Sequence, residues 1–105
     1  MNTFNAGRES WYNETRPWTV YLLSKGDNKY VGITSKSLRA RLTKHKKMAL
    51  NPTRLTPINI AMQRSGLNNW RMKKLASLKG TFYEAREIER TYLHLSNLNE
   101  ARSKP

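Results

Sequence analysis

The amino-acid composition of this chain limits the kinds of chemical site that it can build. There is no cysteine, and two isolated histidines, His45 and His94, cannot build a zinc site alone, so disulfides and Cys-based zinc sites are excluded. Carboxylate oxygens remain as protein ligands, and they favour hard cations. We therefore expect any bound metal to be a hard cation held by a carboxylate.

Glu89 is the carboxylate that local structure explains least. Glu84 and Glu87 fall in the first turn of a helix expected from Thr81 onward, where Glu84 completes a capping box and negative charge suits the helix dipole. Glu89 lies past that turn, at the edge of the apolar face. It could be an ordinary surface glutamate, but a single carboxylate also suits Mg²⁺, which keeps much of its shell as water.

Two tyrosines are expected to face one another across a β-hairpin. Residues 18–24 (WTVYLLS) and 29–34 (KYVGIT) are rich in β-branched and aromatic residues, and the Gly-Asp-Asn between them is typical of a turn. A loop over residues 25–28 places Tyr21 opposite Gly32, with Tyr30 on the same face. Two phenols would then meet over a residue without a side chain. Each could equally be an ordinary amphipathic sheet residue.

An arginine and a histidine share one flank of the helix expected next. Ser35 or Ser37 can cap this helix, and residues 38, 42, 45 and 49 form its apolar stripe before Asn-Pro at 51–52 ends it. Arg41 and His45 are four residues apart, so they stack beside that stripe. Arg41 could bind phosphate through its planar guanidinium, or be one more solvated charge. His45 could contact phosphate or carry a proton, or simply pack at the helix edge.

The remaining elements complete a small α/β fold. Thr56-Pro57 is expected to open a second helix with a buried stripe at residues 58, 61, 62 and 65, and Gly66 ends it. Residues 70–78 are predicted to form a third strand. The last helix has its apolar face at residues 85, 88, 92 and 95. The predicted fold is a three-stranded antiparallel sheet flanked by helices, in the order ββααβα.

Positive charge dominates the composition. Twenty Lys and Arg against seven Asp and Glu give a formal net charge of +13. The repulsion among so many positive charges lowers the stability of the fold unless a polyanion binds to the surface. We therefore expect nucleic acid as the partner. A bias for solubility is the alternative, and no long apolar run or basic amphipathic helix supports a membrane role. The expected backbone-binding residues, each of which could alone be a solvated charge, are Arg39, Lys44, Lys46, Lys47, Arg54, Arg64, Arg71, Lys73 and Lys74.

The chain has room for one domain. Its 105 residues supply one modest core. Residues 1–17 are polar and irregular, and we expect an N-terminal arm there, with Trp11 and Tyr12 tying its end to a domain over residues 18–105. No hydrophobic leader is visible at the N-terminus, so we expect the protein to stay in the cytoplasm.

Taken together, these motifs resemble the GIY-YIG nuclease superfamily. That family pairs a first motif ending in Tyr with a Tyr-Ile/Val-Gly motif, then a helix with Arg and His four residues apart, and a later helix with Glu in Glu-Ala-x-x-x-Glu. The corresponding segments here are WTVYLL at 18–23, KYVGIT at 29–34, LRARLTKH at 38–45 and EAREIE at 84–89. The resemblance spans residues 18–99, and the ordered set of motifs is far more specific than any one of them.

The resemblance implies a small stand-alone endonuclease that hydrolyses phosphodiester bonds of DNA with one Mg²⁺ or Mn²⁺ ion. It assigns Glu89 as the metal ligand, Arg41 as the residue that stabilises the phosphate, and His45 as an assisting group. Tyr21 and Tyr30 would activate water and position the phosphate. We favour Tyr21 as the base, although a phenol with an ordinary pKa near 10 needs nearby cations for that role. A phage or other mobile element would fit such a nuclease.

Some features depart from the family pattern. The first motif matches only in its Tyr, and the Asn that often follows the Glu helix would be Asn97 or Asn99, both closer to Glu89 than usual. A second DNA-recognition domain is also missing, so the protein could cut with little sequence preference, recognise DNA structure, form a homodimer or need a protein partner. The rival functions are a non-catalytic nucleic-acid-binding module on the same fold and an RNA-binding protein with exposed tyrosines for base stacking.

Overall fold

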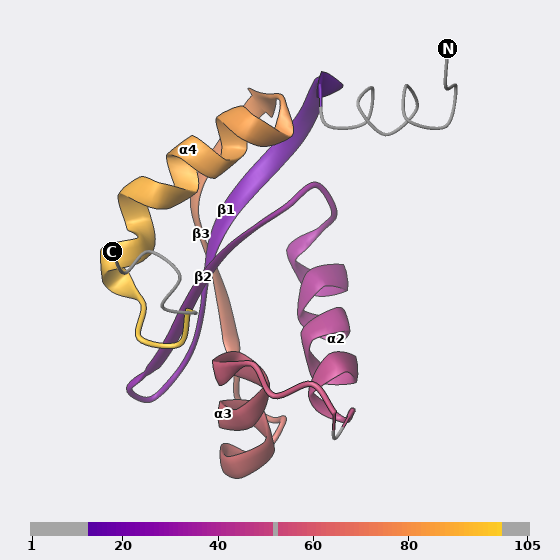
Figure 1. Ribbon diagram of the computed structural model, residues 1–105, viewed down its shortest axis with the longest axis vertical. Helices are drawn as coiled ribbons and strands as arrows, with labels where there is room; N and C mark the ends of the chain where they lie inside the picture. Colours follow the sequence, from indigo (N-terminus) through magenta and orange to yellow (C-terminus); the bar gives the residue numbers. More distant parts are fainter. Residues whose placement is uncertain (1–12, 52, 100–105) are drawn as a thin grey trace.

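The computed structural model describes residues 13–51 and 53–99. Its elements follow the predicted order (Figure 1): β1 (Arg16–Lys25), β2 (Asn28–Thr34), α2 (Leu38–Ala49), α3 (Pro57–Ser65), β3 (Arg71–Gly80), α4 (Phe82–Tyr92) and a short 3-10 turn, η1 (Leu93–Leu95). The strands form one antiparallel sheet in the order β2-β1-β3, which confirms the predicted α/β fold. Trp11 and Tyr12 lie outside the described residues, and β1 begins within the segment expected to be an arm.

The β1–β2 hairpin has the predicted register but a tighter turn. Tyr21 pairs with Gly32, as expected. Pairing continues to Lys25 and Asn28, so the turn has two residues rather than the four we assumed. Gly26 permits this turn because its φ is +59°, a value that favours glycine and suits two-residue hairpins. Both turns give the same pairing, so the phenols still share one face.

β3 pairs with the other side of β1 and makes β1 the central strand. The β1–β3 register shifts through a bulge between Val20 and Tyr21. A bulge bends its strand and increases the local twist. The bend therefore falls on the part of β1 that carries Tyr21.

Helices cover both faces of the sheet. Figure 1 shows α2 on one side of the strands and α4 on the other, with α3 beside the lower end of the sheet. On the first side, Tyr21 and Leu23 of β1 are fully buried and pack in one cluster with Ala49 of α2 and with Ile58 and Met62 of α3. Burying such large side chains removes apolar area from water, which is the main force holding α2 and α3 to the sheet.

On the second side, α4 begins where a tryptophan and a capping box hold it. Trp18 of β1 donates through Nε1 to the Gly80 carbonyl at 3.1 Å, and its ring meets Phe82 edge-on at 5.8 Å between centroids. The predicted capping box is confirmed: the Thr81 N–H donates to Glu84 Oε1 at 2.8 Å, and the Glu84 N–H donates to Thr81 Oγ1 at 3.2 Å. These contacts fix the start of α4 relative to β1.

The other helix signals are also largely confirmed. Of the two serines considered, Ser37 caps α2, and its Oγ accepts from the Ala40 N–H at 3.1 Å. α3 begins at Pro57 after the cap residue Thr56 and ends before Gly66, whose φ is +88°. Within the described residues, no helix is long and apolar enough to cross a membrane.

Several side chains lie differently from the prediction. Ser65 is exposed and turns its Oγ back to the Ala61 carbonyl at 2.8 Å, whereas Asn59 is buried and donates to the Arg54 carbonyl at 3.3 Å. Leu95 lies beyond α4 in η1 and is 37% exposed. Glu89 is 6% exposed, so it lies within the packed face of α4 rather than at its edge. β3 also extends to residue 80, past the expected end.

Candidate active site

Gly32 lets the two tyrosines close over the hairpin. The rings of Tyr21 and Tyr30 lie 6.4 Å apart between centroids. A Cβ placed on Gly32 would lie 2.5 Å from Tyr21 Oη and 3.0 Å from Tyr30 Cε2, so no side chain fits there while the phenols hold these positions. The predicted meeting of two phenols over a glycine is confirmed.

Arg41 and His45 of α2 meet at the hydroxyl of Tyr21. Arg41 Nε donates to Tyr21 Oη at 3.0 Å, and His45 Nε2 lies 2.8 Å from the same oxygen. Because the oxygen already accepts the Arg41 proton, its own proton can be donated to Nε2 of a neutral imidazole that carries its proton on Nδ1. The two residues spaced four apart on α2 therefore converge on one phenol of the sheet.

Burial determines the protonation states of this pair. Tyr21 is fully buried and His45 is 3% exposed. Burial raises the pKa of the Tyr21 phenol above its ordinary value, and the positive charge of Arg41 offsets only part of that effect. Burial first, and the charge of Arg41 second, lower the pKa of His45 from 6.5 to about 4. At neutral pH the contact therefore joins a neutral phenol to a neutral imidazole.

Two hollows adjoin this cluster, and the same tyrosine and arginine line both. The first has a volume of about 250 Å³ and is bordered by α2, the α2–α3 connection, α3 and the segment after η1. It is lined by Tyr30, Arg41, His45, Met48, Arg54, Thr56, Pro57, Ile58, Asn59, Leu98 and Asn99. The second has a volume of about 170 Å³ and is lined by Tyr30, Ile33, Arg41, Phe82, Arg86 and Glu89. Of the two tyrosines, Tyr30 is the one that reaches the open space.

Glu89 brings a carboxylate of α4 into the second hollow. Its side chain is 8% exposed, and its Oε1 lies 3.3 Å from Nε of Arg86, one turn earlier on the helix. Nε of Arg86 is buried and makes no hydrogen bond, so this contact is electrostatic. The guanidinium of Arg86 also lies 5.7 Å from the centre of the Phe82 ring. The sequence prediction missed Arg86, although its spacing of three residues from Glu89 was a visible signal.

Mg²⁺ or Mn²⁺ fits this hollow through one protein ligand. Within the described part of the chain, no group of three or more His, Cys, Asp or Glu side chains could hold a metal. The Glu89 carboxylate can supply one oxygen, and about 170 Å³ leaves room for several waters at about 30 Å³ each. Mg²⁺ commonly keeps several waters and takes only one or two carboxylates, so the donor set agrees with this ion.

Two asparagines after η1 hold the outer edge of β2. Asn97 Oδ1 accepts from the Lys29 N–H at 2.9 Å, and its Nδ2 donates to the Asp27 carbonyl at 2.7 Å. Asn99 Oδ1 accepts from the Val31 N–H at 3.0 Å, and its Nδ2 donates to the Val31 carbonyl at 2.8 Å. Both asparagines that the sequence left as alternatives therefore bind β2, and Asn99 also lines the first hollow.

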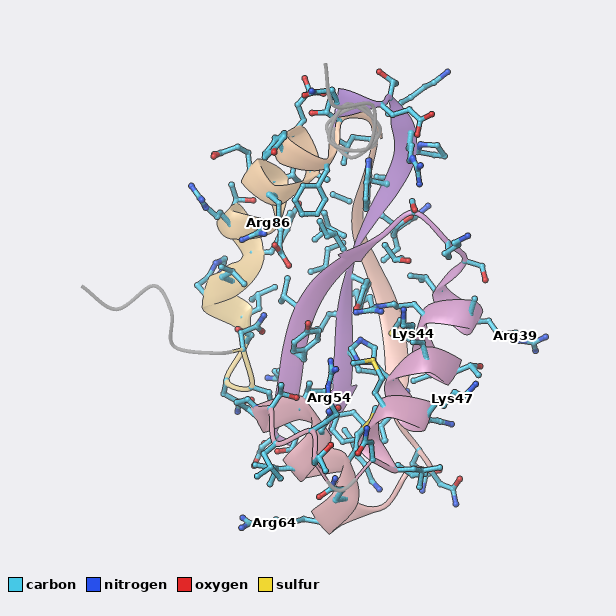
Figure 2. The ribbon with its side chains drawn as sticks, turned by 45° about the vertical axis from the view of Figure 1, so that its right-hand side comes forward. Arg39, Lys44, Lys47, Arg54, Arg64 and Arg86 are labelled. Atoms are coloured by element: carbon cyan, nitrogen blue, oxygen red, sulfur yellow. The ribbon has the colours of Figure 1, made fainter. Side chains whose placement is uncertain are left out.

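The basic residues expected to bind nucleic acid are spread over several elements. Figure 2 shows Arg54 near the middle of the molecule, whereas Arg39 and Arg64 project outward. Arg54 lines the first hollow together with Arg41. The other basic residues named above, all exposed except the half-buried Lys46, lie outside both hollows; they are Arg39, Lys44, Lys46, Lys47, Arg64, Arg71, Lys73 and Lys74.

The three-stranded sheet and the order of its helices agree with the fold of a GIY-YIG nuclease domain. The GIY-YIG catalytic domain family matches residues 17–102. This match covers most of the chain, so the chain belongs to the GIY-YIG family, a family of nucleases that act on DNA. No curated protein and no solved structure matches the chain significantly.

Proposed function

We propose that the protein is a metal-dependent DNA endonuclease that hydrolyses phosphodiester bonds with one divalent cation. The observation that supports this most is the second hollow, where Tyr30 of β2, Arg41 of α2 and Glu89 of α4 line one space. Phosphodiester hydrolysis needs a group beside the attacking water, positive charge on the phosphate oxygens and positive charge near the leaving oxygen. These three side chains are suited to those three tasks.

Arg41 would bind the scissile phosphate. Its Nε is held by Tyr21 Oη at 3.0 Å, which leaves the terminal nitrogens of the planar guanidinium for two phosphate oxygens. A donor held in place before the substrate arrives stabilises charge that develops in the transition state without further reorganisation. In this proposal the buried Tyr21–His45 contact serves to hold Arg41.

Although the sequence favours Tyr21 as the base, Tyr30 takes the role beside the attacking water in this proposal. Tyr30 would contact the attacking water because it lines both hollows. Tyr21 is fully buried with a raised pKa, so it is poorly placed to accept a proton from water. Tyr30→Phe should then lower kcat with little change in KM, whereas Tyr21→Phe should also raise KM by loosening Arg41. Equal effects of both variants on kcat alone would contradict this assignment.

Glu89 would hold Mg²⁺ or Mn²⁺. When bound there, the cation would supply positive charge beside the phosphate and its leaving oxygen. The net charge of +13 would bring the DNA backbone to the protein, and Arg54 would extend the positive surface from Arg41 into the first hollow. A phage or other mobile element remains the setting we propose for such a small nuclease.

Plasmid cleavage tests this proposal with a matched pair of variants. Supercoiled plasmid is incubated with Mg²⁺, Mn²⁺ or a chelator and with wild type, Glu89→Gln or Glu87→Gln. Glu87 is an exposed acid of the same helix, so its variant controls for the loss of one negative charge. We expect metal-dependent nicked or linear product from wild type and Glu87→Gln, and at least about a hundredfold lower rate from Glu89→Gln.

Two results would contradict the proposal in different ways. Full activity of Glu89→Gln would contradict the assignment of Glu89 as the metal ligand. Salt-sensitive binding without cleavage of plasmid, branched DNA or RNA under any metal would support a non-catalytic nucleic-acid-binding module on this fold instead.

A further inference from the structure

Arg86 is placed in the hollow by contacts that a surface arginine does not need. Its side chain is 38% exposed, yet Nε is buried without a hydrogen bond. The guanidinium lies between the Glu89 carboxylate, 3.3 Å from Nε, and the Phe82 ring, 5.7 Å from the guanidinium carbon. Figure 2 shows Arg86 on α4, on the opposite side of the sheet from Arg39 and the other labelled residues of α2. A buried donor that makes no hydrogen bond has a free-energy cost, so the position of Arg86 calls for a second role.

Two arginines share this hollow with the Glu89 carboxylate. Arg41 and Arg86 both line the space that contains Glu89. A divalent cation bound to the Glu89 carboxylate would lie within a few ångströms of the Arg86 guanidinium. Like charges at that separation repel strongly where water is partly excluded. A cation bound to Glu89 therefore disfavours the present position of Arg86.

We propose that Arg86 occupies, in the metal-free protein, the place beside Glu89 that the divalent cation takes during cleavage, and that the displaced guanidinium then binds a phosphate of the DNA. This inference rests on the proposed function. In the metal-free protein Arg86 neutralises a buried carboxylate, whose unpaired burial would be costly. Once a cation neutralises Glu89, the guanidinium needs another anion, and the hollow it shares with Arg41 is where the DNA phosphate would lie.

The proposal predicts changes of opposite sign in two measurements on one variant. Arg86→Met removes the charge and keeps a stem that can pack on Phe82. Without its competitor, Mn²⁺ should bind the DNA-free protein about tenfold more tightly, as measured by the loss of free Mn²⁺ signal in electron paramagnetic resonance. Binding of DNA in the presence of Ca²⁺, measured by fluorescence anisotropy, should weaken severalfold because a phosphate contact is lost.

Arg90→Met is the matched control. Arg90 is on the same helix and pairs with Glu87 at the same spacing, with Nη1 3.1 Å from Oε2, but both side chains are well exposed. Its removal should leave Mn²⁺ affinity unchanged. Arg86→Gln serves as a second variant that, like Arg86→Met, lacks the positive charge. Thermal unfolding of each protein shows that it is folded before titration.

The outcomes separate this inference from the proposed function. Unchanged or weaker Mn²⁺ binding in folded Arg86→Met and Arg86→Gln, with wild type cleaving DNA normally, would overturn the role of Arg86 alone. Tighter Mn²⁺ binding without any loss of DNA affinity would overturn the phosphate contact. A wild type that binds no Mn²⁺ and cuts no DNA would overturn the proposed function, and this inference with it.

Discussion

Acid should destabilise the fold through His45 well before most carboxylates are protonated. The pKa of His45 is lowered in the folded protein from 6.5 to about 4. A lowered pKa means that protonation favours the unfolded chain, so this contribution to stability is present above pH 6.5 and is lost as the pH falls toward 4. Each pKa unit is worth about 1.36 kcal/mol, so the full loss is about 3 kcal/mol. About 2 kcal/mol of it should already be lost at pH 5.

The surroundings of His45 explain why it resists protonation. The residue is 3% exposed, its ring faces those of Tyr21 and Tyr30 at 6.0 and 5.2 Å between centroids, and Arg41 adds a positive charge. A protonated ring could also no longer accept the Tyr21 hydroxyl proton. Among the residues that the structure describes, no acidic side chain lines the hollow that His45 borders, so none of them offsets the new charge there.

Urea unfolding at several pH values between 5 and 7.5 measures this effect. Wild type and His94→Gln, an exposed histidine in η1, should both lose about 2 kcal/mol over this range. His45→Gln should be less stable at neutral pH but should lack most of the slope. The reasoning is refuted if folded His45→Gln keeps the wild-type dependence on pH.

Three further changes test the packing, the DNA surface and the helix start. Gly32→Ala should lower the free energy of unfolding by about 1–3 kcal/mol and abolish cleavage, because its Cβ would meet Tyr21 Oη at 2.5 Å; unchanged stability in urea would contradict the close fit. Arg54→Met should lower DNA affinity and reduce the slope of log affinity against log salt by about one, and it should slow cleavage more than Arg39→Met, which lies outside both hollows. Thr81→Ala should lower stability by about 1 kcal/mol in thermal unfolding, since it removes one half of a capping box; no loss would mean that Trp18 and Phe82 alone hold this helix start.

Local signals were sufficient to predict most of the fold. The pairing of Tyr21 with Gly32 followed from hairpin register, because side chains alternate strictly along a strand. The bounds of α3 followed from Pro57 and Gly66, whose backbone preferences act within one or two residues. The shared flank of Arg41 and His45 followed from helical spacing, but their meeting at the Tyr21 hydroxyl was not predicted.

Features set by long-range packing could not be predicted in this way. Glu89 was placed at the edge of α4, but its burial depends on how α4 meets the sheet and on the arginine that neutralises it. The buried stripe expected for α3 did not include Asn59, whose amide donates to the carbonyl of Arg54 in the preceding connection. The separation of the two tyrosines into one buried and one accessible phenol likewise depends on which of them the hollows reach.

The position of Tyr30 depends on the segment that follows α4. β2 is an edge strand of the described sheet, so one side of its backbone has no neighbouring strand among the described residues. Asn97 and Asn99 supply that side: their amides bind the backbone of Lys29 and Val31, the residues on either side of Tyr30. Because η1 leads directly from α4 to these asparagines, the helix that carries Glu89 and the strand that carries Tyr30 are joined through a short segment of chain. The distance between the proposed metal ligand and the phenol that would meet the water is thus fixed by edge hydrogen bonds, which explains how a domain this small can hold two groups from opposite sides of its sheet at one hollow.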